Sequence, residues 1–143
     1  MQDLNMRKNE QKQCCDTKEK LREAVKTQIE NANAGICEEN EDLLWETIVL
    51  FQGTPFHTAK GLEFTYSIKG YEMFVDRKDK SITKSTVALA YRTAIEIQRE
   101  GKRVTGPKKL KTFGASYLYP LFIQFGVILE YVKDFQYEGG LGL

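Results

Sequence analysis

The feature that most constrains the fold is a pair of alternating segments, 62–68 and 71–77, separated by Lys69-Gly70. In each segment apolar residues occupy every second position, so they fall on one face of an extended strand. A two-residue loop makes Ile68 the partner of Tyr71, and in this register the apolar residues of both strands share a face. The sequence therefore predicts an antiparallel β-hairpin whose apolar face packs on other elements.

Apolar residues at helical spacing flank the hairpin and predict helices on both sides of it. We expect one helix from about Thr17, with Asp16 in a capping box, and a second from about Glu38 to Phe51. A third, long helix follows the hairpin, with Thr83 as its N-cap and Gly101 as its C-terminal stop. The predicted fold class is α+β: a mostly helical domain with one antiparallel β-hairpin packed on helices.

The last third of the chain predicts two short helices joined by a turn. Gly106-Pro107 begins the first, Ser116 caps the second, and Gly126 ends it. The spacing is that of a helix-turn-helix unit, but the second helix has almost no polar group to read a base edge. We therefore expect a core or interface helix there. For segment 127–132 the sequence is consistent with either a strand or more helix.

A chain of 143 residues, 41% of them hydrophobic, is long enough to bury one core. We expect a flexible polar leader over 1–16, a single globular domain over 17–138 and a loose C-terminus over 139–143. No apolar run reaches the length of a membrane span, so no membrane partner is expected.

The cysteines and the polar N-terminus predict a cytoplasmic protein. Cys14, Cys15 and Cys37 make an odd number, which favours reduced thiols; a bridge from Cys14 or Cys15 to Cys37 is the alternative. The N-terminal residues lack the apolar stretch of a signal peptide. His57 is the only histidine, and no cysteine cluster has the spacing of zinc ligands, so neither a metal nor another cofactor is predicted.

The net charge of +1 conceals an uneven distribution. Residues 1–57 carry −4, residues 58–111 carry +7 and residues 112–143 carry −2. A basic segment of this kind favours a polyanionic partner, so we expect non-enzymatic binding of DNA or RNA by the hairpin and the helix after it. The predicted phosphate contacts are Arg77, Lys78, Lys80, Lys84, Ser85 and Arg92, supported by Lys108, Lys109 and Lys111. The alternative is an ordinary solvated helix face.

An enzyme is the second hypothesis. The predicted register places Glu63 opposite Asp76, with Lys78 on the same face. This arrangement resembles the metal site of the PD-(D/E)xK nucleases, although the Pro-Asp element of that family is missing. The resemblance implies carboxylates that hold Mg²⁺ and a lysine that assists the attacking water. The alternative is the ordinary wet face of an amphipathic hairpin.

A protein-interaction module or a homo-oligomer is the third hypothesis. Aromatic residues concentrate between positions 117 and 137, more densely than one buried helix face requires. The candidate contacts with another copy or another protein are Tyr117, Tyr119, Phe122 and Phe125. The alternative is that this segment forms the centre of the core.

Overall fold

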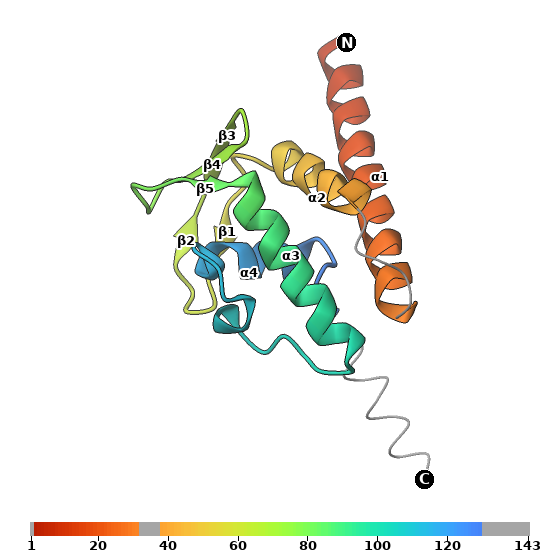
Figure 1. Cartoon of the computed structure of the whole chain (residues 1–143). Coiled ribbons are helices and arrows are strands. Elements are labelled where there is room, and N and C mark those ends of the chain that lie inside the picture. Colours follow the sequence, from red (N-terminus) through yellow and green to blue (C-terminus); the bar gives the residue numbers. More distant parts are fainter. Residues whose placement is uncertain (1, 32–37, 130–143) are drawn as a thin grey trace.

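The computed structural model describes residues 2–31 and 38–129 (Figure 1). Its helices and two small antiparallel sheets form an α+β fold, as predicted. The helical elements are α1 (Gln2–Glu30), α2 (Glu38–Leu50), α3 (Lys84–Arg99), the 3-10 helix η1 (Pro107–Leu110) and α4 (Ala115–Gln124). The strands are β1 (Phe56–His57), β2 (Glu63–Phe64), β3 (Tyr66–Lys69), β4 (Glu72–Val75) and β5 (Ile82–Thr83). No helix in this described part is long and apolar enough to cross a bilayer.

The predicted hairpin is formed by β3 and β4, but its register is shifted by two residues. Ile68 pairs with Met73 instead of Tyr71. The reason is the turn: Gly70 takes a φ of +61° at its first central position, so Lys69 is spared the left-handed conformation. Because side chains alternate with period two, the shift keeps the predicted faces. It moves Tyr71 into the turn, where it is 70% exposed.

Two further strands were not predicted. β5 pairs with β4 and completes a three-stranded sheet in the order β3-β4-β5. β1 pairs with β2, with Phe56 opposite Phe64. The single strand predicted over 62–68 is therefore divided between two sheets, with Thr65 between the two parts.

Three hydrogen bonds join the C-terminal end of α2 to β3. The Tyr66 hydroxyl donates to the carbonyl of Ile48 at 2.6 Å, and Gly53 N–H donates to the carbonyl of Tyr66 at 2.9 Å. Ile68 N–H donates to Oε1 of Gln52 at 2.9 Å. These bonds satisfy backbone groups at a helix end and a sheet edge, and they fix the hairpin on the helical part of the molecule.

The boundaries of α2 and α3 agree with prediction within about one residue. The Thr83 hydroxyl accepts from Thr86 N–H as the N-cap of α3, and Gly101 follows the helix with a φ of +79°. The helix start predicted at Asp16 is wrong, because α1 begins at Gln2. The polar segment before Asp16 is rich in Gln, Lys and Glu, which are good helix formers.

The start of α4 also differs from the prediction. Ser116 lies inside the helix, and Gly114 is the N-cap residue, with a φ of +74°. A Cβ atom at position 114 would lie 2.3 Å from Cδ1 of Ile82. Glycine therefore allows both the left-handed backbone and the close approach of this turn to β5. Gly126 follows α4 with a φ of +81°, as the predicted stop required.

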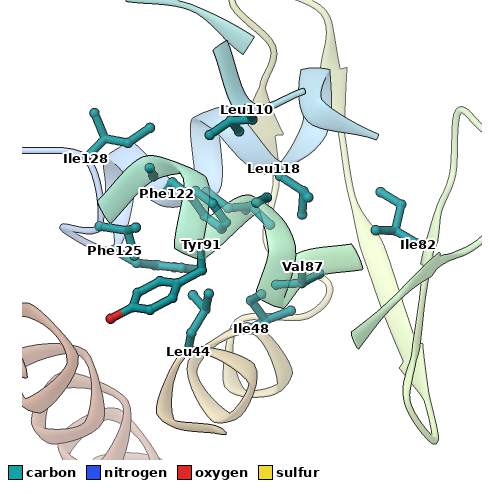
Figure 2. Packing of buried hydrophobic residues seen from close by; sticks show 14 of the residues in the cluster. Leu44, Ile48, Ile82, Val87, Tyr91, Leu110, Leu118, Phe122, Phe125 and Ile128 are labelled. Carbon is teal, nitrogen blue, oxygen red and sulfur yellow. The ribbon is translucent and has the colours of Figure 1, made fainter. Parts of the chain in front are cut away.

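The core is formed by residues of all four α-helices, η1 and both sheets, and Figure 2 shows Tyr91 of α3 beside Leu44 of α2. The buried residues of α3 lie along one helical stripe: Val87, Ala90, Tyr91, Ala94, Ile95 and Gln98. Gln98 at its end donates to the Val127 carbonyl and accepts from Leu129 N–H. These two bonds anchor the segment after α4, which forms no regular structure as far as Leu129; the rest of the predicted tail lies outside the described residues.

Candidate nucleic-acid interface

The cations predicted on α3 are paired with acidic residues of α2. Lys84 Nζ lies 2.9 Å from Oδ1 of Asp42, and this hydrogen bond raises the pKa of Lys84. Arg92 donates from Nε and Nη2 to the two carboxylate oxygens of Glu41, which is only 9% exposed. Ser85 is exposed beside these pairs. Since carboxylates already neutralise Lys84 and Arg92, we leave this face out of the candidate interface.

The connection between β4 and β5 brings two lysines to one aromatic ring. Nζ of Lys78 lies 4.5 Å and Nζ of Lys80 lies 5.1 Å from the centroid of Phe113. Both distances are within the range of cation–π attraction. The Phe113 side chain is 40% exposed. It is held here because the adjacent Gly114 packs against Ile82 of β5.

Arg77 has a different position from the two lysines. Its Nε donates to the carbonyl of Glu63 at 2.6 Å and so ties the end of β4 to β2. The guanidinium is committed to this backbone contact at the edge of the sheet. Arg77 therefore lies beside the candidate interface and contributes to its architecture.

The carboxylates proposed for metal binding are not brought together as predicted. Glu63 pairs with His57 across β1 and β2, and its carboxylate lies 3.6 Å from Nε2 of that histidine. Asp76 accepts from Thr65 N–H at 3.2 Å. Within residues 2–31 and 38–129, no group of three or more His, Cys, Asp or Glu side chains has the arrangement of a metal site. The predicted pairing of Glu63 with Asp76 is wrong because the hairpin register is shifted.

A pocket of about 590 Å³ lies between η1 and the loop that joins β1 to β2. Its apolar wall is formed by Ala59, Leu62, Pro107 and Tyr117. Its polar lining consists of the lysines and hydroxyl groups of Lys60, Lys108, Lys109, Thr58, Thr105 and Ser116. Lys111 is exposed outside this lining. An apolar wall with lysines and hydroxyl-bearing residues beside it suits a ligand that has an apolar part and an anionic part.

Tyr117 connects this pocket to the Phe113 ring. It lines the pocket, and its ring centroid lies 5.9 Å from Nζ of Lys78. Its ring also packs edge-on against Phe64, with centroids 5.0 Å apart. We call the combined region the lysine–aromatic surface. It consists of Lys60, Leu62, Lys78, Lys80, Lys108, Lys109, Phe113 and Tyr117.

The aromatic residues predicted as an interface are divided between core and surface. Phe122 and Phe125 are 0% and 1% exposed, so they belong to the core and cannot contact a partner in this fold. Tyr117 and Tyr119 are half-buried and pack against that core. Tyr131, Phe135 and Tyr137 lie outside the described residues. The structure therefore agrees with the alternative that segment 117–125 forms part of the core.

Three members of the surface were not predicted as site residues: Lys60, Leu62 and Phe113. Lys60 lies in the turn between β1 and β2, two strands too short to give a periodic signal. Phe113 stands beside the basic segment, directly before the turn glycine Gly114, but nothing in its spacing distinguishes an exposed ring from a buried one. Comparisons of the chain with protein-family models, curated proteins and solved structures give no match.

Proposed function

We propose that the protein binds nucleic acid through the lysine–aromatic surface, without catalysing a reaction on it. The supporting observation is the exposed Phe113 ring, with the ammonium groups of Lys78 and Lys80 4.5 and 5.1 Å away. Lysines supply the phosphate attraction that dominates such binding, and an exposed ring adds a surface on which bases stack.

The charges of the surface agree with this proposal. Five lysines lie on it, and none of them forms a salt bridge with a carboxylate among those found in the described residues: Lys60, Lys78, Lys80, Lys108 and Lys109. Lys84 and Arg92 of α3, by contrast, are paired with Asp42 and Glu41. The proposed interface is therefore built from loops and η1 rather than from α3.

We also propose a cytoplasmic location for this function. The support is the odd number of cysteines, three, in a chain with no framework of regularly spaced pairs. Reduced thiols are the ordinary state of such residues in a cytosol.

The test is binding of fluorescently labelled DNA and RNA, single-stranded and duplex, followed by anisotropy across a salt series. Each phosphate contact contributes about 0.7–0.9 to the slope of log K against log salt, so five lysines predict a slope of about −4. Absence of binding at low salt, or a flat salt dependence, would refute the proposal.

A further inference from the structure

The pocket beside η1 has the size and lining of a site for one small planar group. Its volume of about 590 Å³ lies within the range of sites for small ligands. Leu62 is 49% exposed at its wall, so the wall offers apolar surface that water now covers. Thr58, Thr105 and Ser116 also line it, and their side chains carry hydroxyl groups that can form hydrogen bonds, although the Thr58 hydroxyl already accepts one from Leu62 N–H at 3.1 Å. A nucleobase has the flat shape, apolar faces and polar edges that match this lining.

Phe113 offers a second place for a base. The ring is 40% exposed and stays in position because Gly114 packs against Ile82. Tyr117 lines the pocket and shares the Lys78 ammonium group with Phe113, and its ring is held by an edge-on contact with Phe64. The two aromatic rings are therefore positioned before a ligand arrives, which lowers the cost of ordering them on binding. The ammonium groups of Lys78 and Lys80, which lie over the Phe113 ring, must shift aside to admit a base there.

The lysines lie where the linking phosphates of a strand would pass. Lys108 and Lys109 line the pocket, whereas Lys78 and Lys80 are close to the Phe113 ring. Two base sites with cations beside each are the pattern expected for neighbouring nucleotides of one strand.

A duplex fits this arrangement less well. In a double helix both faces of each base are stacked, and its edges are read by a helix or ribbon inserted into a groove. The lysine–aromatic surface presents loops and the four-residue η1 around a hollow instead. Exposed Phe113 and Leu62 gain contact area only from a base that is already unstacked.

We infer that the ligand of the lysine–aromatic surface is a single strand, with one unpaired base in the pocket and a neighbouring base stacked on Phe113. This inference rests on the proposed function and deepens it. A free nucleotide shares the chemistry of one unit of the strand, so the experiment must separate the two sources.

The experiment measures anisotropy of labelled 12-nucleotide strands, oligo(dT) and oligo(rU), and of a duplex of equal length, all at low salt. We expect the single strands to bind at least about tenfold more tightly than the duplex. Phe113→Leu keeps apolar bulk but removes the ring, and we expect it to weaken single-strand binding about tenfold. Leu62→Asn, at the pocket wall, should weaken it about threefold or more.

Phe74→Leu is the matched control. Phe74 is 37% exposed and also has a lysine near its ring, with Nζ of Lys69 5.8 Å from the centroid, but it lies on the outer face of the β3-β4-β5 sheet. The inference expects this variant to bind as the unmodified protein does. Circular dichroism melting of each variant checks that the fold is retained.

The possible results separate the inference from the proposed function. Duplex binding as tight as single-strand binding, or single-strand binding unaffected by Phe113→Leu, overturns the inference and leaves nucleic-acid binding in place. Thymidine or uridine monophosphate is tested as a competitor beside the unlabelled strand. If the mononucleotide competes at the same concentration as the strand, the pocket is assigned to a free nucleotide, and the inference is also overturned. Absence of binding to every nucleic acid removes both.

Discussion

The ammonium group of Lys78 lies 4.5 Å from the ring centroid of Phe113 and 5.9 Å from that of Tyr117. One cation from the β4–β5 connection therefore contacts the turn before α4 and the first turn of α4 itself. These contacts link segments far apart in the chain and connect the Phe113 ring with the pocket that Tyr117 lines.

Lys78→Gln should weaken nucleic-acid binding and lower the magnitude of the salt slope by about 1, because one phosphate contact is lost. Lys20→Gln is the control: it removes the same charge from an exposed position on α1, which lies on the other side of the molecule from the sheets (Figure 1). Anisotropy across a salt series measures both effects. Equal effects of the two substitutions would indicate a response to overall charge, not to this surface.

Arg92→Met should destabilise the fold and leave binding within about twofold. The substitution removes both hydrogen bonds to Glu41, a carboxylate only 9% exposed. Since Arg92 is partly exposed, we expect a loss of about 1–2 kcal/mol in the free energy of unfolding. Urea denaturation measures this loss. A large fall in nucleic-acid affinity with an unchanged free energy of unfolding would show that the α3 face is part of the interface.

The hairpin shows what a sequence pattern can and cannot specify. The buried face of Tyr66, Met73 and Val75 followed from period-two alternation, which tolerates a shift of two residues. The register depended on which residue took the positive φ in the turn. Gly70 takes it at the first central position, so the strands pair two residues away from the predicted alignment.

Sequence reasoning identified only those residues of the candidate site that stand out by their charge. Lys78, Lys80, Lys108 and Lys109 were expected from the basic segment and lie on the surface we propose. Lys84 and Arg92 were expected too, but their partners Asp42 and Glu41 are 42 and 51 positions away in the chain. Local spacing reveals only pairs within a helical turn or two, so these partners could not be seen.

Gly114→Ala should cost more stability than Gly70→Ala, although both glycines have a positive φ. A Cβ at position 70 meets no atom within 4 Å, so the substitution carries only backbone strain of about 1 kcal/mol. At position 114 the Cβ would lie 2.3 Å from Cδ1 of Ile82, which adds about 1–3 kcal/mol of overpacking. Thermal unfolding of the two variants gives the comparison, and equal losses would contradict the close packing of this turn on β5.

Tyr66→Phe should lower the free energy of unfolding by about 1 kcal/mol while the hairpin is retained. The substitution removes the hydroxyl that donates to the Ile48 carbonyl in the last turn of α2, and leaves that carbonyl without this donor. Burial raises the pKa of Tyr66, so the neutral phenol that makes this bond persists in the fold. Urea denaturation provides the measurement; an unchanged midpoint would mean that water replaces the hydroxyl.

The ion pair between Lys84 and Asp42 should make part of the stability depend on alkaline pH. The hydrogen bond to Asp42 raises the pKa of Lys84 above its usual value of 10.5. The folded state therefore binds this proton more tightly than the unfolded state. The contribution is fully present below pH 10.5 and is lost as pH rises through the higher pKa of the folded state.

The measurement compares the unmodified protein with Lys84→Gln from pH 7 to pH 11.5 by urea denaturation. Because the Asp42 side chain is 66% exposed, we expect a stability difference below about 1 kcal/mol at neutral pH. It should stay constant up to about pH 10 and then shrink. Asp42→Asn should give a similar difference, and the double variant little more, since both substitutions break the same pair. A difference that grows above pH 10.5 would show that Lys84 stabilises the fold through its neutral form.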